Sequence, residues 1–273
     1  MKDRESGCCA VGVPADATQM QRVPNTEFAS SRHQKLALIL GVDMKIVPIK
    51  VELIDSMGDD LSVVNAARVS FAKESEYDRV DIGAPIAVNQ LKTADKKLIK
   101  YLAEHNHWSP FSHAYASFRI KAPIFVARQL VKHTVGLSWN EVSRRYVSTE
   151  PEFYLPKIWR KAAENVKQGS SDEDSKTTWD YAACQLIEEA DMIYKQLLND
   201  GVCAEQARMI LPQNTMTEWI WSGSLYAFAR VCNLRLDSHT QQETQTVARL
   251  IDSYMIELFP ESWEVLVNDN DNK

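Results

Sequence analysis

The stretch that decides the fold of this chain is Arg128-Gln-Leu-Val-Lys-His-Thr-Val-Gly-Leu-Ser-Trp-Asn-Glu-Val-Ser-Arg-Arg-Tyr146. It combines four cationic side chains with hydroxyl, amide, imidazole and carboxylate groups. The whole chain, in contrast, is acidic, with a formal net charge of -6 and a pI near 5.6. A local basic cluster in an acidic protein indicates a bound anion, because guanidinium groups bind phosphate and carboxylate in bidentate geometry. The simpler interpretation is a solvated helix face followed by a polar loop.

The bulk composition is that of a globular protein with a large core. The chain has 273 residues, of which 45% are hydrophobic and 25% are charged, as is ordinary for one large domain. Its acidic balance argues against a nucleic-acid partner, and no apolar run approaches the roughly 20 residues that span a bilayer. Five irregularly spaced cysteines, without a CxxC or HExxH motif, predict reduced thiols in the cytoplasm and no metal site.

The first 43 residues differ from the rest of the chain. They are rich in small and polar residues without a clear period, whereas Met44 opens the strand-like run Lys45-Ile-Val-Pro-Ile-Lys-Val-Glu-Leu-Ile54. We therefore expect a flexible extension over residues 1–43 and a single folded domain over residues 44–273. The polar stretch from Gln168 to Lys176 is typical of a loop inside that domain.

Helices dominate the expected secondary structure, with a few strands between them. Apolar residues recur at helical spacing in segments 60–71, 94–105, 124–133, 179–199, 204–210, 224–234 and 240–259. Alternating segments predict strands over 113–120 and 215–221, in addition to the run after Met44. This order of elements predicts an α+β architecture.

Two arginines outside the basic stretch are candidates for binding a ligand. Glu205 and Arg208 lie three residues apart on a short helix, so they share a face and can pair. Arg235 lies among apolar residues, and a partly buried arginine needs an anionic or carbonyl partner. Either Asp237 or a bound ligand can be that partner.

Other polar groups have simpler interpretations. Ser238 and Thr240 are typical of caps on the helix that follows them. The run from His105 to His113 carries histidine and serine in a loop suited to a phosphate or a flat ring, but its spacing is not that of a metal site. Cys203 and Cys232 lie near arginines, yet a buried apolar thiol is the commoner role for such residues.

Several motifs in this order resemble the flavin-dependent thymidylate synthase family, over about Val51 to Val265. The hallmark of that family is an Arg-His-Arg triplet followed by Ser-x-Asn-Glu-x-Ser-x-Arg-Tyr, and the second part is complete in Ser138-Trp-Asn-Glu-Val-Ser-Arg-Arg-Tyr146. The flanking matches are Asp60-Leu-Ser-Val-Val-Asn-Ala-Ala-Arg-Val-Ser-Phe71, His107-Trp-Ser-Pro-Phe111, Lys121-Ala-Pro-Ile-Phe-Val-Ala-Arg-Gln129, Glu152-Phe-Tyr-Leu-Pro156 and Asn233-Leu-Arg-Leu-Asp-Ser-His239. The resemblance implies helices packed around a small, mostly antiparallel sheet.

Four departures from the family pattern fall on its flavin side. The triplet reads Lys132-His133-Thr134, and the gap that follows it is one residue longer. A family glutamate is Ser112 here, and Ser224, Tyr226 and Arg230 occupy positions where relatives place flavin-contacting Asn and Arg residues. The lysine keeps one charge but loses the planar fork of arginine. We hypothesise that Arg230 restores the charge lost at the third position of the triplet.

The resemblance implies conversion of dUMP to dTMP with FAD, reduced by NADPH, and with methylenetetrahydrofolate as the carbon donor. It also implies a homotetramer whose sites are shared, with Arg208 and Arg235 from one chain and most other substrate ligands from another. Expected to bind dUMP are Gln129, Glu141, Ser143, Arg144, Arg145, Tyr146, Arg208 and Arg235. Expected to contact FAD are His107, Ser109, Lys132, His133, Thr134, Asn140, Glu141, Arg230 and His239. Expected at the reacting centre are Arg235, Ser143, Glu141 and His107.

The resemblance further implies that hydride from the flavin activates the pyrimidine, so that Ser143 binds substrate and is not a nucleophile. Two alternatives remain open at this stage. The first is altered chemistry on a pyrimidine nucleotide, such as hydroxymethylation or action on dCMP. The second is a non-catalytic homologue that binds nucleotide, which the changed triplet motivates and which the intact Glu141, Ser143, Arg145 and Arg235 oppose.

Overall fold

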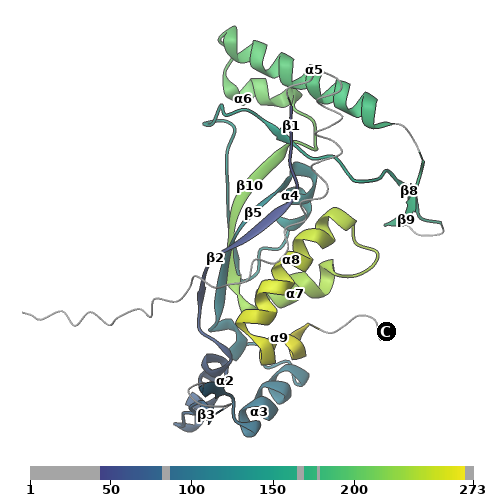
Figure 1. The fold of residues 1–273 in the computed structure, drawn as a ribbon. Helices are drawn as coiled ribbons and strands as arrows, with labels where there is room; N and C mark the ends of the chain where they lie inside the picture. The colour runs from purple at the N-terminus through teal and green to yellow at the C-terminus, as the bar shows by residue number, and fades with distance from the viewer. Residues whose placement is uncertain (1–43, 82–86, 165–168, 177–178, 268–273) are drawn as a thin grey trace, which may run out of the picture.

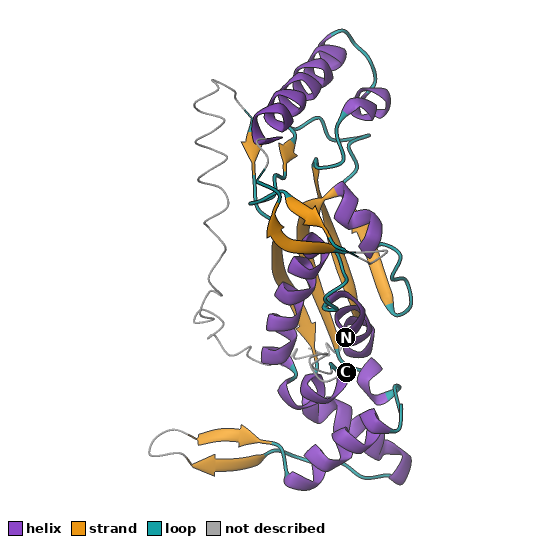
Figure 2. Ribbon diagram, turned by 90° about the vertical axis from the view of Figure 1, so that its right-hand side faces the viewer, coloured by secondary structure: helices purple, strands orange, loops and turns teal. Residues whose placement is uncertain are grey.

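The computed structural model describes residues 44–81, 87–164, 169–176 and 179–267. The extension expected over residues 1–43 lies outside the described residues. Within the described ranges the chain forms an elongated α+β molecule, with helices at both ends of a central sheet and along one of its faces (Figure 1). Figure 2 shows the same elongated arrangement from a direction turned by 90°. The expected fold class is confirmed.

The central sheet has four antiparallel strands. In order across the sheet they are β2 (Lys50–Met57), β5 (Tyr115–Pro123), β10 (Met216–Ser224) and β6 (Leu137–Glu141). β10 pairs with β5 along its whole length and with β6 on its other side. The three strands expected from alternation correspond to β2, β5 and β10.

Alternation gives this sheet one buried face and one exposed face, as period-2 side-chain orientation requires. Phe118, Trp219 and Trp221 are buried, whereas Arg119 and Ile220 between them are exposed. Two long helices cover the buried face: α7 (Leu225–Arg235) and α8 (Gln242–Leu258). The Phe118 ring meets Phe228 of α7 edge-on, with ring centroids 5.1 Å apart. This contact fixes α7, and with it the arginine at its end, against the sheet.

Two groups of helices lie at opposite ends of the sheet (Figure 1). At one end are η1 (Val69–Phe71), η2 (Pro110–Ser112), α2 (Asp60–Arg68), α3 (Thr93–Glu104), α9 (Pro260–Leu266) and the hairpin of β3 (Asp78–Asp81) and β4 (Ala87–Gln90). At the other end are α4 (Ile124–Leu130), α5 (Trp179–Asn199), α6 (Ala204–Ala207), η3 (Arg208–Ile210) and the parallel pair of β1 (Lys45–Ile46) and β7 (Glu152–Phe153). Phe153 and Ile187 belong to a second, smaller core at this end. Among the described helices, none has the length and apolar character needed to cross a membrane.

The seven expected helical segments are all present, although α4 ends three residues early, at Leu130. The expected loop from Gln168 to Lys176 is wrong in part, because Ser170–Asp174 forms strand β9, which pairs with β8 (Arg160–Ala162). Because its side chains are polar, this strand lacks the apolar alternation that indicates a strand in a sequence. The hairpin is held by contacts with α8 instead of an apolar face of its own, since Arg160 bonds both Ser170 and Glu243.

Strand β6 also lies in a stretch that the sequence suggested was a polar loop. Leu137 and Trp139 pack against the main core, while Ser138 between them and Asn140 after them are exposed. The close approach of β6 to β10 requires Gly223, because an added Cβ there would lie 2.4 Å from Leu137 Cδ2 and 2.7 Å from the Gly136 carbonyl. The strand depends on a distant partner, which local alternation did not reveal.

The expected capping of α8 by Ser238 or Thr240 is wrong. Gln241 occupies the N-cap position and forms no side-chain cap. Instead, Gln245 reaches back and donates its amide to the carbonyls of Thr240 and Asp237, at 2.7 and 3.2 Å. The polar groups of this turn are therefore satisfied from inside the helix and not from its first residue.

We predict that Phe118→Ala lowers the free energy of unfolding by about 3–5 kcal/mol, because the side chain is fully buried and a cavity remains. Urea denaturation measures the loss. The matched control is Arg119→Ala on the exposed face of the same strand, whose ion pair with Glu218 is half exposed and contributes at most about 1 kcal/mol. Equal losses for the two variants would contradict the assignment of the two faces.

Candidate active site

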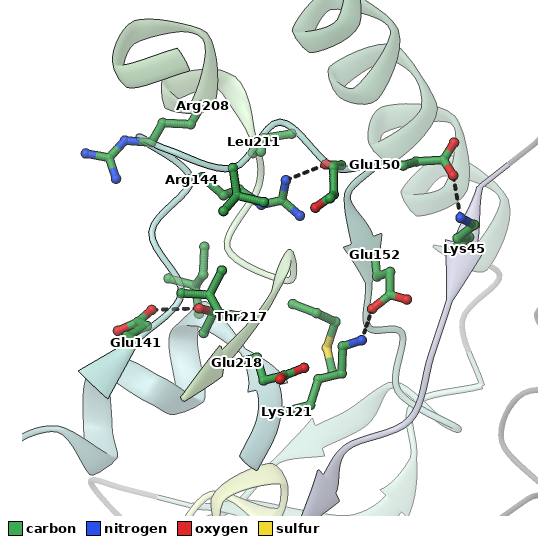
Figure 3. A pocket seen from close by; sticks show the side chains of 15 residues that line it. Lys45, Lys121, Glu141, Arg144, Glu150, Glu152, Arg208, Leu211, Thr217 and Glu218 are labelled. Carbon is green, nitrogen blue, oxygen red and sulfur yellow. Dashed lines mark hydrogen bonds and ion pairs between the residues drawn. The ribbon is translucent and has the colours of Figure 1, made fainter. Parts of the chain in front are cut away.

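A pocket of about 410 Å³ opens between the start of β10, the end of β6 and the loop that follows β6 (Figure 3). Its charged and hydroxyl-bearing residues are Lys45, Lys121, Glu141, Arg144, Thr149, Glu150, Glu152, Arg208, Thr217 and Glu218. Three residues expected to bind substrate, namely Glu141, Arg144 and Arg208, are therefore brought together in one pocket. We call these three residues the pocket group.

The two lysines of this pocket are neutralised by carboxylates, but its two guanidinium groups are not. Lys45 pairs with Glu150 at 2.6 Å, and Lys121 pairs with Glu152. Arg144 donates to the Thr149 carbonyl at 2.9 Å, and Arg208 donates to the backbone carbonyl of Glu205 at 3.4 Å. Neither arginine forms an ion pair with any described carboxylate, and Figure 3 shows the Arg208 guanidinium pointing away from the carboxylates. These two groups are available to an anion.

The expected pairing of Arg208 with the Glu205 side chain is thus replaced by a contact with its backbone carbonyl. The hydrogen bond uses only Nε, so the two terminal nitrogens retain their donors. A guanidinium group that is exposed at the edge of a pocket suits the bidentate binding of a phosphate.

Glu141, in contrast, is held in place by two donors. Its Oε1 accepts the Thr217 hydroxyl at 2.7 Å, and its Oε2 accepts the Trp139 indole N–H at 3.2 Å. Trp139 in turn stacks on Trp219, with ring centroids 4.3 Å apart. The carboxylate is therefore fixed relative to the core and is presented at the rim of the pocket.

The loop after β6 carries the remaining expected phosphate ligands on the surface. Arg145 Nε donates to the Ser143 hydroxyl at 3.1 Å, and the Arg145 guanidinium carbon lies 5.0 Å from the Tyr146 ring centroid. Arg145 and Tyr146 are both exposed. This arrangement keeps the hydroxyl and the guanidinium next to each other, so one anion can contact both.

Arg235 lies apart from this pocket, at the end of α7, and contacts His133. Its Nε donates to His133 Nε2 at 3.0 Å. Burial lowers the pKa of His133, and the charges of Arg235 and Arg230 lower it further, so the ring is neutral and can accept this bond at neutral pH. Burial also lowers the pKa of Arg235, which has no ion pair with a described carboxylate. A bound anion or carbonyl would offset that cost.

The possible internal partner of Arg235 forms a different contact. Asp237 Oδ1 accepts from the backbone of His239 at 2.8 Å and lies 3.0 Å from its ring Nδ1. Of the cysteines near these arginines, Cys232 is unsuited to supply a reactive thiolate. Burial raises the pKa of Cys232 well above its usual range, and Cys203 lies on the exposed surface before α6.

Gln129 of α4 is tied to the start of α8. Its amide nitrogen donates to the side-chain oxygen of Gln241, and its amide oxygen accepts the Thr244 hydroxyl at 3.1 Å. Within one chain the expected substrate ligands thus form two sets: the pocket group with Ser143, Arg145 and Tyr146 of the adjoining loop, and Gln129 and Arg235, which do not line the pocket. His133, which was expected on the flavin side, contacts Arg235. The resemblance implies that Arg208 and Arg235 of one chain act on the same substrate; within one chain Arg208 lines the pocket with Glu141, and Arg235 does not line it.

Only some of the residues expected to contact FAD lie together in one pocket. A smaller pocket of about 190 Å³ is lined by His107 and Arg230, with Trp108 and Tyr226 beside them. Glu141 lines the larger pocket, and His133 contacts Arg235. The remaining five are exposed and lie outside the smaller pocket: Ser109, Lys132, Thr134, Asn140 and His239. Lys132 and Thr134 flank His133 in the turn after α4, and Asn140 pairs with Ile220 on the exposed face of the sheet.

Sequence reasoning missed the residues that hold the expected ligands. The role of Trp139 could have been predicted, because it precedes Glu141 by two residues and therefore lies on the same side of a strand. Thr217, Gln241 and Thr244 contact their partners only through the register of distant elements. No local pattern indicates such contacts.

We predict that the pKa of His133 rises in Arg235→Met, because a neighbouring positive charge disfavours the imidazolium. Histidine ring NMR signals followed against pH, assigned with a His133→Gln variant, measure the shift. Arg208→Met is the matched control, since Arg208 lies with the pocket group and should leave this pKa unchanged. An unaltered pKa in Arg235→Met would contradict the contact.

Comparison with known proteins connects this site to a family. The profile of the family described as "Thymidylate synthase complementing protein" matches residues 52–261. The chain is 38% identical to the "Flavin-dependent thymidylate synthase" of Thermosipho africanus, over 80% of this chain and 90% of that protein. It is also 38% identical to the enzyme of that name from a strain of Thermus thermophilus, over 78% of this chain and 73% of that protein.

A solved structure is similar over most of its length. It is the "UMP/dUMP methylase PolB from Streptomyces cacaoi bound with 5-Br dUMP", with a TM-score of 0.68 and 31% identity over 81% of this chain and 96% of that chain. The resemblance inferred from the motifs is therefore confirmed. This chain belongs to the flavin-dependent thymidylate synthase family.

Proposed function

We propose that this protein methylates dUMP to dTMP, with methylenetetrahydrofolate as carbon donor and NADPH as the source of reducing equivalents. The observation that carries the proposal is the pocket group, in which Arg144 and Arg208 have no described carboxylate partner beside an anchored Glu141. Family membership then indicates which anion such a pocket takes.

The substrate phosphate would lie against Arg208 and the loop that carries Ser143 and Arg145. A nucleotide monophosphate carries nearly two negative charges, and guanidinium and hydroxyl donors meet its oxygens with charge-assisted hydrogen bonds. Arg235 would face the pyrimidine. As negative charge develops on the ring, a fixed guanidinium stabilises it more than it stabilises the ground state, which lowers the barrier.

The described residues fit a flavin, although they do not enclose one. His107, Arg230 and Tyr226 would hold part of FAD, since they line one pocket and combine a cation with aromatic surface. The flavin supplies the hydride that this chemistry needs. The neutral His133 accepts from Arg235 and thereby orients it between the flavin side and the substrate side.

We further propose a homotetramer in which subunits share sites. The pocket of about 190 Å³ on the flavin side is smaller than the roughly 300–1,000 Å³ typical of ligand sites. The pocket group and Arg235 also form separate sets within one chain. Both facts are accounted for if a second subunit completes each site.

A cytoplasmic location belongs to the same proposal. The three described cysteines are all unpaired, and one of them is exposed. Free exposed thiols suit a reducing compartment.

UMP is a second candidate substrate. The observation that favours it is the similarity to PolB, whose solved structures bear 5-Br dUMP and 5-Br UMP. None of the residues expected to bind substrate is predicted to exclude the 2′-hydroxyl group of a ribonucleotide. Both nucleotides therefore belong in the first assay.

We expect the product of dUMP to gain one methyl group in a flavin-dependent manner when the protein is incubated with FAD, NADPH and methylenetetrahydrofolate. Mass spectrometry of the nucleotide measures the gain. A hydroxymethyl product would favour the altered chemistry, and methylation of UMP alone would favour the ribonucleotide. Unchanged nucleotide from a folded protein that does not bind FAD would favour the non-catalytic homologue.

We predict that Arg235→Ala lowers the turnover of dUMP roughly 10- to 150-fold while FAD remains bound, because the variant loses a charge-assisted contact to the pyrimidine, worth about 1.5–3 kcal/mol. Turnover and the flavin absorbance of the purified protein measure the two effects. Arg119→Ala, on the exposed sheet face, is the matched control and should retain activity. Loss of flavin with retained dUMP affinity would refute this role for Arg235.

A further inference from the structure

We propose that Glu150 is a positioning residue for substrate binding: it fixes the end of the loop of residues 142–150 and thereby orients the Arg144 guanidinium toward the anion in the pocket. We call the contacts of Glu150 with Lys45 and Lys195 the anchor. That the anion is the phosphate of dUMP rests on the proposed function. The anchor itself rests only on contacts within this chain.

The Glu150 carboxylate is held between two elements. Its Oε1 accepts from Lys195 Nζ of α5 at 3.1 Å, and its Oε2 lies 2.6 Å from Lys45 Nζ of β1. The hydrogen bonds from Lys45 and Lys195 hold the pKa of Glu150 below its usual range, so the carboxylate is ionised at neutral pH. Because each oxygen faces its own cation, a shift of the side chain away from either lysine loses a charge-assisted contact.

Both lysines belong to elements that are tied to packed residues. Lys195 Nζ also contacts Asp191 Oδ2 at 2.8 Å, one turn earlier on α5. The Asp191 side chain is only 8% exposed, and its Oδ1 has no hydrogen-bond partner among the described residues. Lys45 lies beside Ile46, which is part of the smaller core. The anchor is therefore part of a charge network with a buried member, unlike an isolated surface ion pair, which contributes little.

The backbone beside Glu150 carries the effect to Arg144. The peptide that joins Thr149 to Glu150 offers its carbonyl to Arg144 Nη1 at 2.9 Å. Pro151 follows, and a residue before proline is restricted to extended backbone conformations. A fixed Glu150 side chain therefore also restrains the direction of this carbonyl. Figure 3 shows Arg144 and Lys45 on opposite sides of Glu150.

This arrangement gives the Arg144 guanidinium a defined direction before any ligand binds. Its bond to the carbonyl uses one N–H of a terminal nitrogen, and its other donors have no partner among the described residues. A guanidinium held at one edge loses less side-chain entropy when an anion binds. Without the anchor, Arg144 would have to be ordered during binding, and the affinity for the anion would fall.

Charge alone predicts the opposite effect, which makes the proposal testable. Glu150 and Glu152 both line the pocket, so removal of either carboxylate makes the pocket more favourable for a phosphate. The Glu152 carboxylate contacts Lys121 of β5 and is not part of the anchor. Glu152→Gln is therefore the matched control, because it removes the same charge from the same pocket and keeps the anchor.

We expect Glu150→Gln to weaken the binding of dUMP to the FAD-loaded protein roughly threefold to tenfold, which corresponds to about 0.6–1.4 kcal/mol. Glu152→Gln should bind dUMP at least as tightly as the unaltered protein. Isothermal titration measures the dissociation constants. Unchanged or tighter binding by Glu150→Gln would overturn the proposal, and so would equal weakening by the two variants.

A double-mutant cycle tests whether the effect passes through Arg144. Arg144→Met removes the guanidinium, so that Glu150→Gln added to it should cause no further loss of dUMP affinity. If Glu150→Gln weakens binding by the same factor with and without Arg144, it acts on the fold in general, and the positioning role is wrong.

A second measurement needs no substrate. The backbone amides of Tyr146 and Val147 donate to the Ser143 carbonyl within the loop. Hydrogen–deuterium exchange of these two amides should be faster in Glu150→Gln and unchanged in Glu152→Gln, because only the first variant loses the anchor. Unchanged exchange in Glu150→Gln would overturn the anchor, whatever the protein does with dUMP.

The two measurements distinguish this proposal from the proposed function. Faster exchange without weaker binding, in a protein that methylates dUMP, would overturn the positioning role alone. Faster exchange in a protein that neither binds nor methylates dUMP would support the anchor and overturn the proposed function. Inorganic phosphate then replaces dUMP in the titration, and weaker phosphate binding by Glu150→Gln than by Glu152→Gln remains the expected result.

Discussion

Strand β10 is the element on which the positions of Glu141, Arg208 and Arg235 depend. It pairs with β5 on one side and with β6 on the other. The segment that ends in Arg208–Ile210 leads into its first residues, and α7 leaves directly from its last, where the Ser224 hydroxyl accepts the Ala227 N–H at 3.2 Å. The register of one strand therefore sets Glu141 through β6, Arg208 through the preceding turn, and Arg235 through α7. A slip of one residue would move the buried tryptophans to the exposed face.

The two sets of substrate ligands are connected through an aromatic cluster on the buried face. The His133 ring lies 6.4 Å from Trp221, Trp221 lies 5.5 Å from Trp139, and Trp139 donates to Glu141. Close-packed aromatic rings transmit position because they cannot shift without opening voids. The distance between the Arg235 set and the pocket group is thus fixed by the core. Flexible side chains at the surface do not determine it.

The parts of the fold that were predictable from the sequence are those with a local period. Amphipathic segments predicted the seven helices, and alternation predicted β2, β5 and β10, because each buries one face. β6 and β9 were missed, since Glu141 and Ser170 lie in polar stretches whose strand character comes from partners far along the chain. The motifs likewise indicated most expected ligands. Their supports were not predictable, because Glu141 and the Thr217 that donates to it are 76 residues apart and no pattern joins them.

The altered triplet is best understood from the positions of its side chains and of the charged groups around them. Lys132 and Thr134 are exposed in the turn after α4, and neither forms an ion pair with a described carboxylate. His133 between them is half buried, and the charge of Arg230, from α7, acts on it together with that of Arg235. We hypothesise that this cation on the neighbouring helix offsets the one that Thr134 lacks, so that the positive potential around His133 is kept. On this hypothesis the site tolerates a change of residue type within the triplet, because a bound anionic group responds to the summed electrostatic field and not to one side chain. The hypothesis that Arg230 restores the lost charge therefore has a spatial basis that the linear motif could not provide.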